Sequence, residues 1–420
     1  MFAGEGNSQA IDLSNVKQSI MQIFLDTSHT SYSSARTGIQ SVVRGLIAGL
    51  SRQCEVHALR WSFRKGCLTP LKPKWQSNLD HLPRKMYHLP LSSLLRPAFW
   101  PLWRETLGMD YRAPIHLHPS HGPNLKGSWL IFPELMEGHH VRLATAYARK
   151  YGMRVAGIFY DAIPWLHPEL VLHWSARDHE DYMTAFAGLD VVIPISQHSA
   201  ADYIRFAQEK GLPLPPVRAC GLASQIFGQK RETLLKVKNS GVVKLLYVAT
   251  LEPRKNHALL MGAFEEAASR LNGQKVELHL VGGVYPSAPE IGEEVRAAAT
   301  KNPGIIWHNR VGNDELRRLY MDCDFTVYAT RIEGFGLPVM ESMWFGRPCL
   351  CSNEAVIAEN AAGGGCLMVD MRDPKAVAEG IVTLAGQPGL RRELGEQVLG
   401  RKLKTWDEYG AEVLEILKTV

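Results

Sequence analysis

The sequence predicts an α/β protein with two Rossmann-like, doubly wound parallel-sheet domains that face each other across a cleft. The chain has 420 residues, which is more than one hydrophobic core usually holds, so we expect two domains. Its hydrophobic fraction of 45% and charged fraction of 21% are typical of a globular protein. Short apolar runs alternate with helical patterns in both halves of the chain, which is the pattern of such sheets.

The first half contains three apolar runs that we expect to be strands, followed by polar loops and helical patterns. An apolar run within 19–28 precedes a helical pattern of apolar residues between Val42 and Leu50. Two more runs lie at 154–160 and 190–195. This half therefore reads as alternating strands and helices.

A polar and charged segment at 228–241 separates the halves, and an apolar strand restarts at 242–248. We therefore expect one domain at 1–232 and a second at 233–402.

The second half repeats the alternation, with expected strands at 276–281, 305–308, 325–328 and 348–351. Ligands bind at the carboxyl ends of the strands in sheets of this kind. We expect five loops to converge on the cleft, namely those that begin at Gly38, Asp161, Leu251, Gly282 and Arg331.

Composition also indicates the compartment. The chain lacks both an apolar run of membrane-spanning length and the pattern of a signal peptide, so we expect a cytoplasmic protein. The seven cysteines are scattered and include no Cys-x-x-Cys pair, so we expect reduced thiols and neither a disulfide framework nor a zinc site.

One stretch is strongly basic. Residues 51–100 carry nine lysines and arginines against two acidic residues, and aromatic side chains are interleaved with them. The stretch 60–104 therefore suits peripheral contact with the inner face of the plasma membrane. A solvated basic face, or one that steers an anionic soluble substrate, explains the same composition.

The most informative segment is the glycine-rich turn at 333–348. Gly334 and Gly336 allow close approach of the backbone to a ligand, and Pro338 suits the first turn of a helix. A helix N-terminus of this kind binds phosphate through its free amides. Glu333 and Glu341 are poor phosphate ligands, because like charges repel, but good acceptors for sugar hydroxyl groups. The combination predicts a nucleotide-sugar site.

A second segment supplies positive charge. Arg254 and Lys255 follow the strand that ends at Val248, where they would neutralise a diphosphate. A solvent-exposed turn is the simpler alternative, because Arg-Lys pairs are common on protein surfaces.

Together these segments resemble glycosyltransferase family 4, retaining enzymes with the two-domain GT-B fold. Its signature pairs two glutamates, separated by seven residues, within Glu-Gly-Phe-Gly-x-Pro, and Glu333 and Glu341 match it. The resemblance implies that Glu333 contacts the transferred sugar and Glu341 the nucleotide ribose. It places the acceptor in the first domain and the nucleotide sugar in the second, with a C-terminal helix at 403–420 packing back on the first domain.

The same resemblance assigns the other candidate residues. The catalytic candidates are Glu333, Lys255 and Asp161. Besides Glu341, the residues expected to bind the donor are Gly38, Ser196, Thr250, Arg254, Lys255, Gly334, Phe335, Gly336 and Leu337. The acceptor candidates are His118, His121 and Tyr160. Asp161 could equally cap a turn before Pro164, and Ser196 could equally be a helix N-cap.

Two other patterns are set aside. Asp322-Cys323-Asp324 looks like an Asp-x-Asp metal motif but precedes a strand, and the histidines at 116, 118 and 121 lack a completing ligand. We expect neither a metal nor a cofactor, and no nucleic acid partner.

The resemblance is to bacterial mannosyltransferases of O-antigen or exopolysaccharide assembly. It implies a hexosyltransferase that moves mannose from GDP-mannose to a glycan or lipid-linked glycan acceptor with retention of configuration. A UDP-sugar or another GDP-sugar would use the same phosphate contacts. Two readings of a different class are a GT-B sugar-nucleotide epimerase and an inactive scaffold of a polysaccharide complex.

Overall fold

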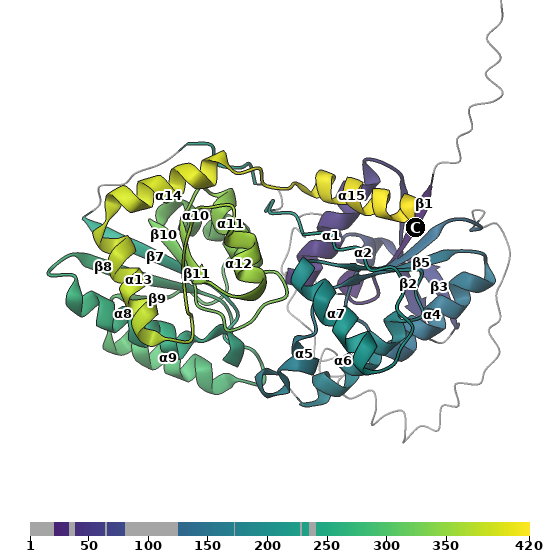
Figure 1. Cartoon of the computed structure of the whole chain (residues 1–420), viewed down its shortest axis with the longest axis horizontal. Coiled ribbons are helices and arrows are strands. Elements are labelled where there is room, and N and C mark those ends of the chain that lie inside the picture. Colours follow the sequence, from purple (N-terminus) through teal and green to yellow (C-terminus); the bar gives the residue numbers. More distant parts are fainter. Residues whose placement is uncertain are drawn as a thin grey trace, which may run out of the picture.

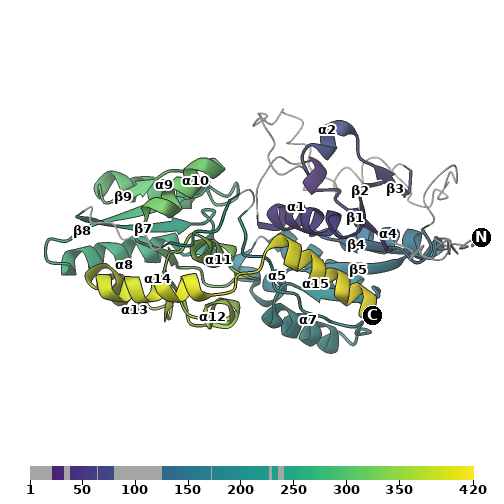
Figure 2. The same cartoon turned by 90° about the horizontal axis from the view of Figure 1, so that it is seen from above.

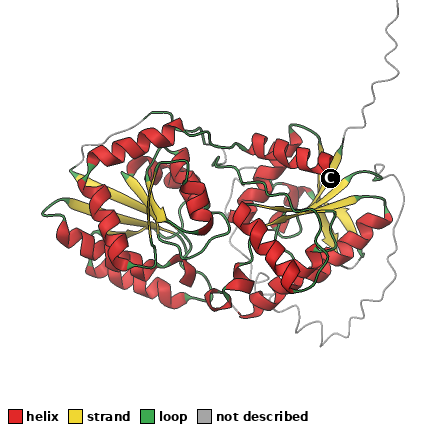
Figure 3. Ribbon diagram, viewed as in Figure 1, coloured by secondary structure: helices red, strands yellow, loops and turns green. Residues whose placement is uncertain are grey.

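The computed structural model describes residues 21–32, 38–63, 65–79, 125–171, 173–226, 229–234 and 241–420. These residues form two α/β domains, each with a six-stranded sheet between layers of helices (Figure 1; Figure 3). The predicted fold class is confirmed. The predicted boundary between 232 and 233 lies between the two sheets and stays a prediction in its exact position.

The first sheet has the strand order β3-β2-β1-β4-β5-β6. All of its paired strands are parallel except β3, which pairs antiparallel with β2 at the edge. This antiparallel edge strand is an addition to the predicted parallel sheet. The strands are β1 (Gln22–Asp26), β2 (Glu55–Ser62), β3 (Cys67–Pro70), β4 (Trp129–Phe132), β5 (Arg154–Phe159) and β6 (Val191–Pro194).

The helices of the first domain follow the strands in the expected alternation. They are η2 (Thr30–Tyr32), α1 (Gly38–Ser51), α2 (Pro73–Gln76), α4 (Gly138–Lys150), α5 (Ile163–Leu166), η5 (Pro168–Leu170), α6 (His173–Phe186) and α7 (Gln197–Glu209).

The second sheet has the order β12-β11-β10-β7-β8-β9, and all of its pairs are parallel. Its strands are β7 (Val242–Val248), β8 (Lys275–Val281), β9 (Ile305–Trp307), β10 (Phe325–Tyr328), β11 (Cys349–Ser352) and β12 (Cys366–Val369). Its helices are η6 (Pro253–Lys255), α8 (His257–Arg270), α9 (Pro289–Lys301), α10 (Asn313–Asp322), α11 (Leu337–Trp344), α12 (Ala355–Ala361), α13 (Pro374–Gly386) and α14 (Pro388–Gly400).

The central strands are continuous apolar runs because helices cover both faces of each sheet. Every residue of β4, β6 and β10 is buried. Strands β2, β3, β4 and β12 were not predicted. Strands β2, β3 and β12 are mostly half-buried, so their hydrophobic pattern is weak.

The last helix, α15 (Trp406–Thr419), leaves the second domain and packs on the first (Figure 2). Thr405 and Glu408 form a capping box at its start. The helix meets α1 at glycines, because a side chain at Gly49 would lie 2.0 Å from the carbonyl oxygen of Trp406. The predicted return of the C-terminal helix to the first domain is therefore confirmed.

We expect Gly49→Ala to lower the free energy of unfolding by about 1–3 kcal/mol, because the added methyl forces α1 and α15 apart. Gly262→Ala in α8 is the matched control, since no atom lies within 4 Å of its new methyl. Removing an exposed helical glycine should raise stability by about 0.5–1 kcal/mol. Chemical denaturation measures both, and equal effects of the two substitutions would contradict the helix contact.

Candidate active site

The predicted cations lie where β7 ends. The short helix η6 presents Arg254 and Lys255, and Asn256 follows in the left-handed region with a φ of 58°. The backbone of this turn is fixed from two sides. The Tyr247 hydroxyl donates to the Lys255 carbonyl, and the side-chain amide of Asn256 donates to the Met371 carbonyl at 3.0 Å. The side chains of the two cations therefore start from a rigid base.

Glu333 joins this turn to the end of β10. Its carboxylate contacts the Lys255 ammonium and lies 2.9 Å from Nη1 of Arg254. The Thr330 hydroxyl donates to it at 2.7 Å. The Glu333 and Lys255 side chains are each only 9% exposed, so this is a buried ion cluster. The structure thus brings together three of the residues that the sequence singled out.

The charged groups of the cluster shift the pKa values of their neighbours. Burial alone would raise the pKa of the Glu333 carboxyl, but the two neighbouring cations outweigh burial and hold that pKa at about 2. Burial and the nearby Arg254 guanidinium lower the pKa of the Lys255 ammonium, while Glu333 opposes them. Glu333 is therefore an ionised acceptor at neutral pH, with both oxygens engaged by donors.

The glycine-rich turn follows Glu333. Gly336 has a φ of 85°, and a side chain there would lie 2.3 Å from Ile357, so both conformation and space require glycine. Helix α11 begins at Leu337 with Pro338 in its first turn, as predicted. Within the described part of the chain, no group accepts a hydrogen bond from the amides of Phe335, Gly336 or Leu337. Unpaired donors in a buried turn form an anion-binding arrangement.

The first domain touches this turn directly. The Ser196 and Ser199 hydroxyls each donate to the Gly334 carbonyl at 3.3 Å. A side chain at Gly334 would lie 2.8 Å from the Asp161 carboxylate. The absence of a side chain at Gly334 lets the first domain approach closely, and its contact with a ligand stays a prediction. Three of the five loops predicted to converge, those that begin at Gly38, Asp161 and Arg331, meet at this contact, where Gly38 also faces Leu337.

Ser196 and Asp161, which the sequence analysis also explained as capping residues, do cap a helix and a turn in the structure. The Ser196 hydroxyl caps α7 by accepting from the Ser199 amide at 3.0 Å. Asp161 accepts from the Ile163 amide at 3.1 Å, which closes the turn before α5. Both residues nevertheless lie beside Gly334, so these roles do not remove them from the site.

Tyr160 requires a correction. It was predicted to contact the acceptor, but it is buried and its hydroxyl donates to the Pro133 carbonyl at 2.6 Å. Its candidacy came from the resemblance of residues 160–164 to a family segment, which does not indicate whether its side chain is buried. His118 and His121, the other acceptor candidates, lie outside the described residues.

Three donor-site candidates remain. Glu341 lies in the second turn of α11 and accepts from the Tyr320 hydroxyl at 3.0 Å, while burial raises the pKa of its carboxyl. Thr250 is exposed after β7. The Phe335 side chain is buried, so only its backbone is available to a ligand. The roles of all three stay predictions.

Sequence reasoning missed several partners of the cluster. Glu252 lies 2.8 Å from Nη2 of Arg254, and the Tyr328 hydroxyl accepts from Lys255 at 3.2 Å. The alternation of charge in Glu252-Pro253-Arg254 was a usable signal for the first contact. The contact with Tyr328 joins segments 73 residues apart and leaves no local signal.

The first domain also holds buried polar groups that were not predicted. Asp26 at the end of β1 pairs with His140 at 2.8 Å, and both side chains are buried. Glu134 accepts from the amides of His29 and Thr30, both at 2.8 Å. Burial raises the pKa of the Glu134 carboxyl to about 7. These contacts fix the segment that follows β1.

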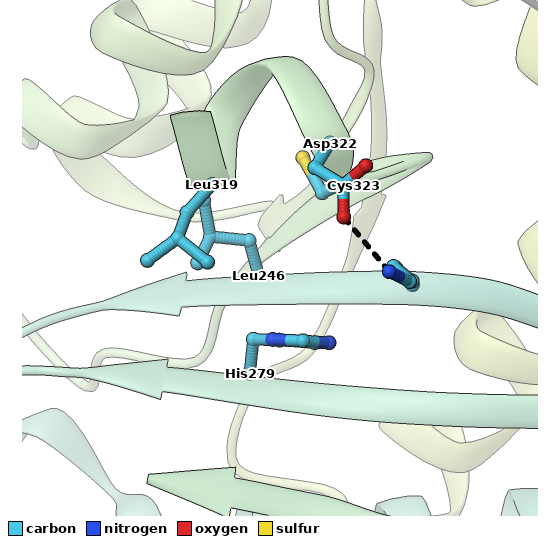
Figure 4. Close-up of a pocket in the computed structure, with 6 residues that line it drawn as sticks. Leu246, His279, Leu319, Asp322 and Cys323 are labelled. Carbon is cyan, nitrogen blue, oxygen red and sulfur yellow. Dashed lines mark hydrogen bonds and ion pairs between the residues drawn. The ribbon is translucent and has the colours of Figure 1, made fainter. Parts of the chain in front are cut away.

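The Asp322-Cys323-Asp324 pattern has a structural explanation. The Lys244 ammonium pairs with Asp322 at 2.8 Å, and the Lys244 amide donates to Asp324 at 2.8 Å. Figure 4 shows the pocket beside this pair, between α10 and the strands β7 and β8. It leaves no space for a water molecule and is not lined by any residue of the ion cluster.

Among the described helices, none has the length and apolar character to cross a membrane.

Comparisons with known proteins identify glycosyltransferases among the relatives of this chain. Residues 243–387 match the family model described as "Glycosyl transferases group 1". The serotype-specific mannosyltransferase WbdA of Escherichia coli is 26% identical over 227 residues, which cover 50% of this chain and 28% of that protein. O-antigen chain mannosyltransferase B of Escherichia coli is 29% identical over 137 residues, covering 33% of this chain and 35% of that protein. The matches thus span about a third of these relatives.

Solved structures support the fold over almost the whole chain. HepE of Anabaena, in complex with UDP, superposes with a TM-score of 0.62 at 14% identity, covering 96% of this chain and 100% of that chain. Sucrose-phosphate synthase of Thermosynechococcus elongatus gives 0.62 at 15% identity, covering 95% and 98%. The chain has the GT-B fold and resembles bacterial O-antigen mannosyltransferases.

We expect Glu333→Gln to lower the free energy of unfolding by about 3–5 kcal/mol at pH 7, because it leaves buried cations without their partner. The folded pKa of about 2 lies below the ordinary value of 4.5, so this stabilisation is present above about pH 4.5 and is lost as the pH falls toward 2. Chemical denaturation between pH 7 and pH 3 measures the difference between wild type and variant.

The matched control is Glu379→Gln, which breaks the exposed pair of Glu379 with Arg270. It should cost less than about 1 kcal/mol. A difference between wild type and Glu333→Gln that stays constant down to pH 3 would contradict the low pKa of Glu333.

Proposed function

We propose that this chain, with its GT-B fold and group 1 glycosyltransferase match, is a retaining, metal-independent transferase that moves mannose from GDP-mannose. The acceptor is a glycan or lipid-linked glycan of bacterial surface polysaccharide synthesis. The observation that carries the proposal is the pairing of a buried Arg254–Lys255–Glu333 cluster with the unpaired amides of the next turn. Free backbone amides and cationic side chains both bind phosphate groups, so together they suit a diphosphate.

Each part of the site has a role in this scheme. The amides of 335–337 and the cations of η6 receive the diphosphate, and Glu333 accepts from hydroxyls of the transferred sugar. Glu341 accepts from the ribose. When the anomeric bond breaks, negative charge gathers on the departing nucleoside diphosphate, which Lys255 and Arg254 stabilise. These cations supply the charge that a metal supplies in other glycosyltransferases.

Retention of configuration is proposed from the resemblance to a retaining family, and the geometry of Glu333 argues against a route through a covalent intermediate. Both oxygens of Glu333 are engaged by donors, and its pKa is held at about 2, so it is a poor candidate for the nucleophile of a covalent intermediate. The acceptor hydroxyl then attacks on the face from which the phosphate departs, and the departing phosphate accepts its proton. Asp161, beside Gly334, is placed to orient the acceptor or the sugar.

GDP-mannose is favoured because the curated relatives named above are mannosyltransferases. A UDP-sugar is the second candidate, because one solved structure of HepE contains UDP-glucose. Contact with the inner membrane face through 60–104 stays a proposal, since residues 80–104 lie outside the described part of the chain.

We expect GDP-mannose and GDP to raise the melting temperature more than UDP and UDP-glucose, because a ligand that binds only the folded state stabilises it by about 3 kcal/mol at 100 times its Kd. Lys255→Met should remove the shift, and Lys301→Met, at an exposed helix end, should keep it. Shifts with uridine compounds alone would overturn the donor assignment. No shift with any nucleotide would overturn the proposal.

Incubation with donor and a mannose-terminated oligosaccharide should give an α-linked product, which the one-bond anomeric C–H coupling in NMR identifies. A β-linkage would overturn retention. The donor incubated alone should remain unchanged, because transfer needs an acceptor. An isomer of the sugar nucleotide in that control would instead indicate an epimerase.

A further inference from the structure

Glu252 forms an ion pair with Arg254, which the proposed function assigns to binding the donor diphosphate. Its Oε1 lies 2.8 Å from Nη2 of Arg254, while Nη1 of the same guanidinium lies 2.9 Å from Glu333. Nη1 also donates to the Ile332 carbonyl at 3.3 Å. Nη1 and Nη2 of Arg254 are thus both paired with carboxylates at the place where a phosphate would bind.

The charges of this cluster cancel. Glu252 and Glu333 contribute two negative charges, and Arg254 and Lys255 contribute two positive charges. Their side chains are only 9–23% exposed, so water screens them weakly. The Asp161 carboxylate of the first domain also acts on Arg254. A diphosphate would therefore meet no excess positive charge unless one carboxylate moves away.

The two carboxylates differ in how firmly they are held. Glu333 contacts Arg254, Lys255 and Thr330 and is 9% exposed. Among the described residues, Glu252 has a side-chain bond to Arg254 alone, and it is 17% exposed. Release of Glu252 breaks one contact and returns the carboxylate toward solvent, whereas release of Glu333 strands two cations. Glu252 is the carboxylate that can leave.

We propose that Glu252 is a placeholder for the donor diphosphate. In the empty site its carboxylate occupies Arg254, and an entering diphosphate displaces it. After sugar transfer the returning carboxylate competes with the nucleoside diphosphate and speeds its release. This inference rests on the proposed function, and it makes Glu252 a positioning residue whose effect acts through Arg254.

The test compares wild type with Glu252→Gln in calorimetric titrations with GDP, UDP, guanosine and uridine. The neutral amide competes less well for Arg254, so the Kd of the preferred nucleoside diphosphate should fall by about tenfold. The nucleosides lack phosphate, so their binding should not change. The dissociation rate of the diphosphate in stopped-flow fluorescence should fall by a similar factor.

Glu379→Gln removes the same charge from an exposed pair and should leave all of these constants unchanged. Glu252→Asp keeps the charge on a shorter side chain and should tighten diphosphate binding less than Glu252→Gln, provided that both variants melt like the wild type. If Glu252→Gln melts early, the comparison is made with Glu252→Asp, for which unchanged or weaker diphosphate binding is then the contradicting result.

Unchanged or weaker diphosphate binding by a stable Glu252→Gln would overturn the placeholder while leaving the proposed function intact. Equal tightening for nucleosides, or the same effect in Glu379→Gln, would also overturn it. Failure of wild type and variant alike to bind either diphosphate would remove the proposed function and the placeholder with it.

Discussion

The buried contact of Glu333 with Lys255 and Arg254 connects two parts of the second domain that are far apart in sequence. It ties the turn after β7 to the turn after β10 and so fixes the segment from which α11 begins. Removing charges from water is costly, and such a cluster persists only when its members satisfy one another. The hydrogen bond from Thr330 and the contact with Tyr328 complete that satisfaction. The unpaired amides of the next turn therefore sit on a rigid support.

The same turn is where the two domains meet. The Gly334 carbonyl is bonded to the two serine hydroxyls at the start of α7, and Glu359 of α12 accepts from the amides of Gln197 and His198 at 3.2 and 3.3 Å. Each contact joins a helix N-terminus or cap of the first domain to the second domain. The turn proposed to bind the donor therefore also forms part of the contact between the domains.

The sequence predicted the parts of this molecule that depend on local pattern. The apolar runs gave β1, β5, β6 and the central strands of the second sheet, and Gly336 and Pro338 marked the start of α11. The half-exposed strands β3 and β12 were missed, because half-exposed residues give no clear period. The family motif that made Tyr160 a candidate does not reveal that its hydroxyl bonds to the buried Pro133 carbonyl. The contacts of Arg254 with Glu333 and of Gly334 with Ser196 join distant segments, up to 138 residues apart, and no local signal specifies them.

The chain crosses between the domains twice. The first crossing follows α7, and the second, at 401–405, leads into α15. The two crossings are bonded to each other: the Ser224 amide donates to the Lys404 carbonyl at 2.8 Å, and the Trp406 indole donates to the Gln225 carbonyl at 2.9 Å. Because the two crossings are bonded to each other, they form a single connection between the domains. Any rotation of one domain relative to the other is therefore centred on this connection, and the parts of each domain farthest from it move the most.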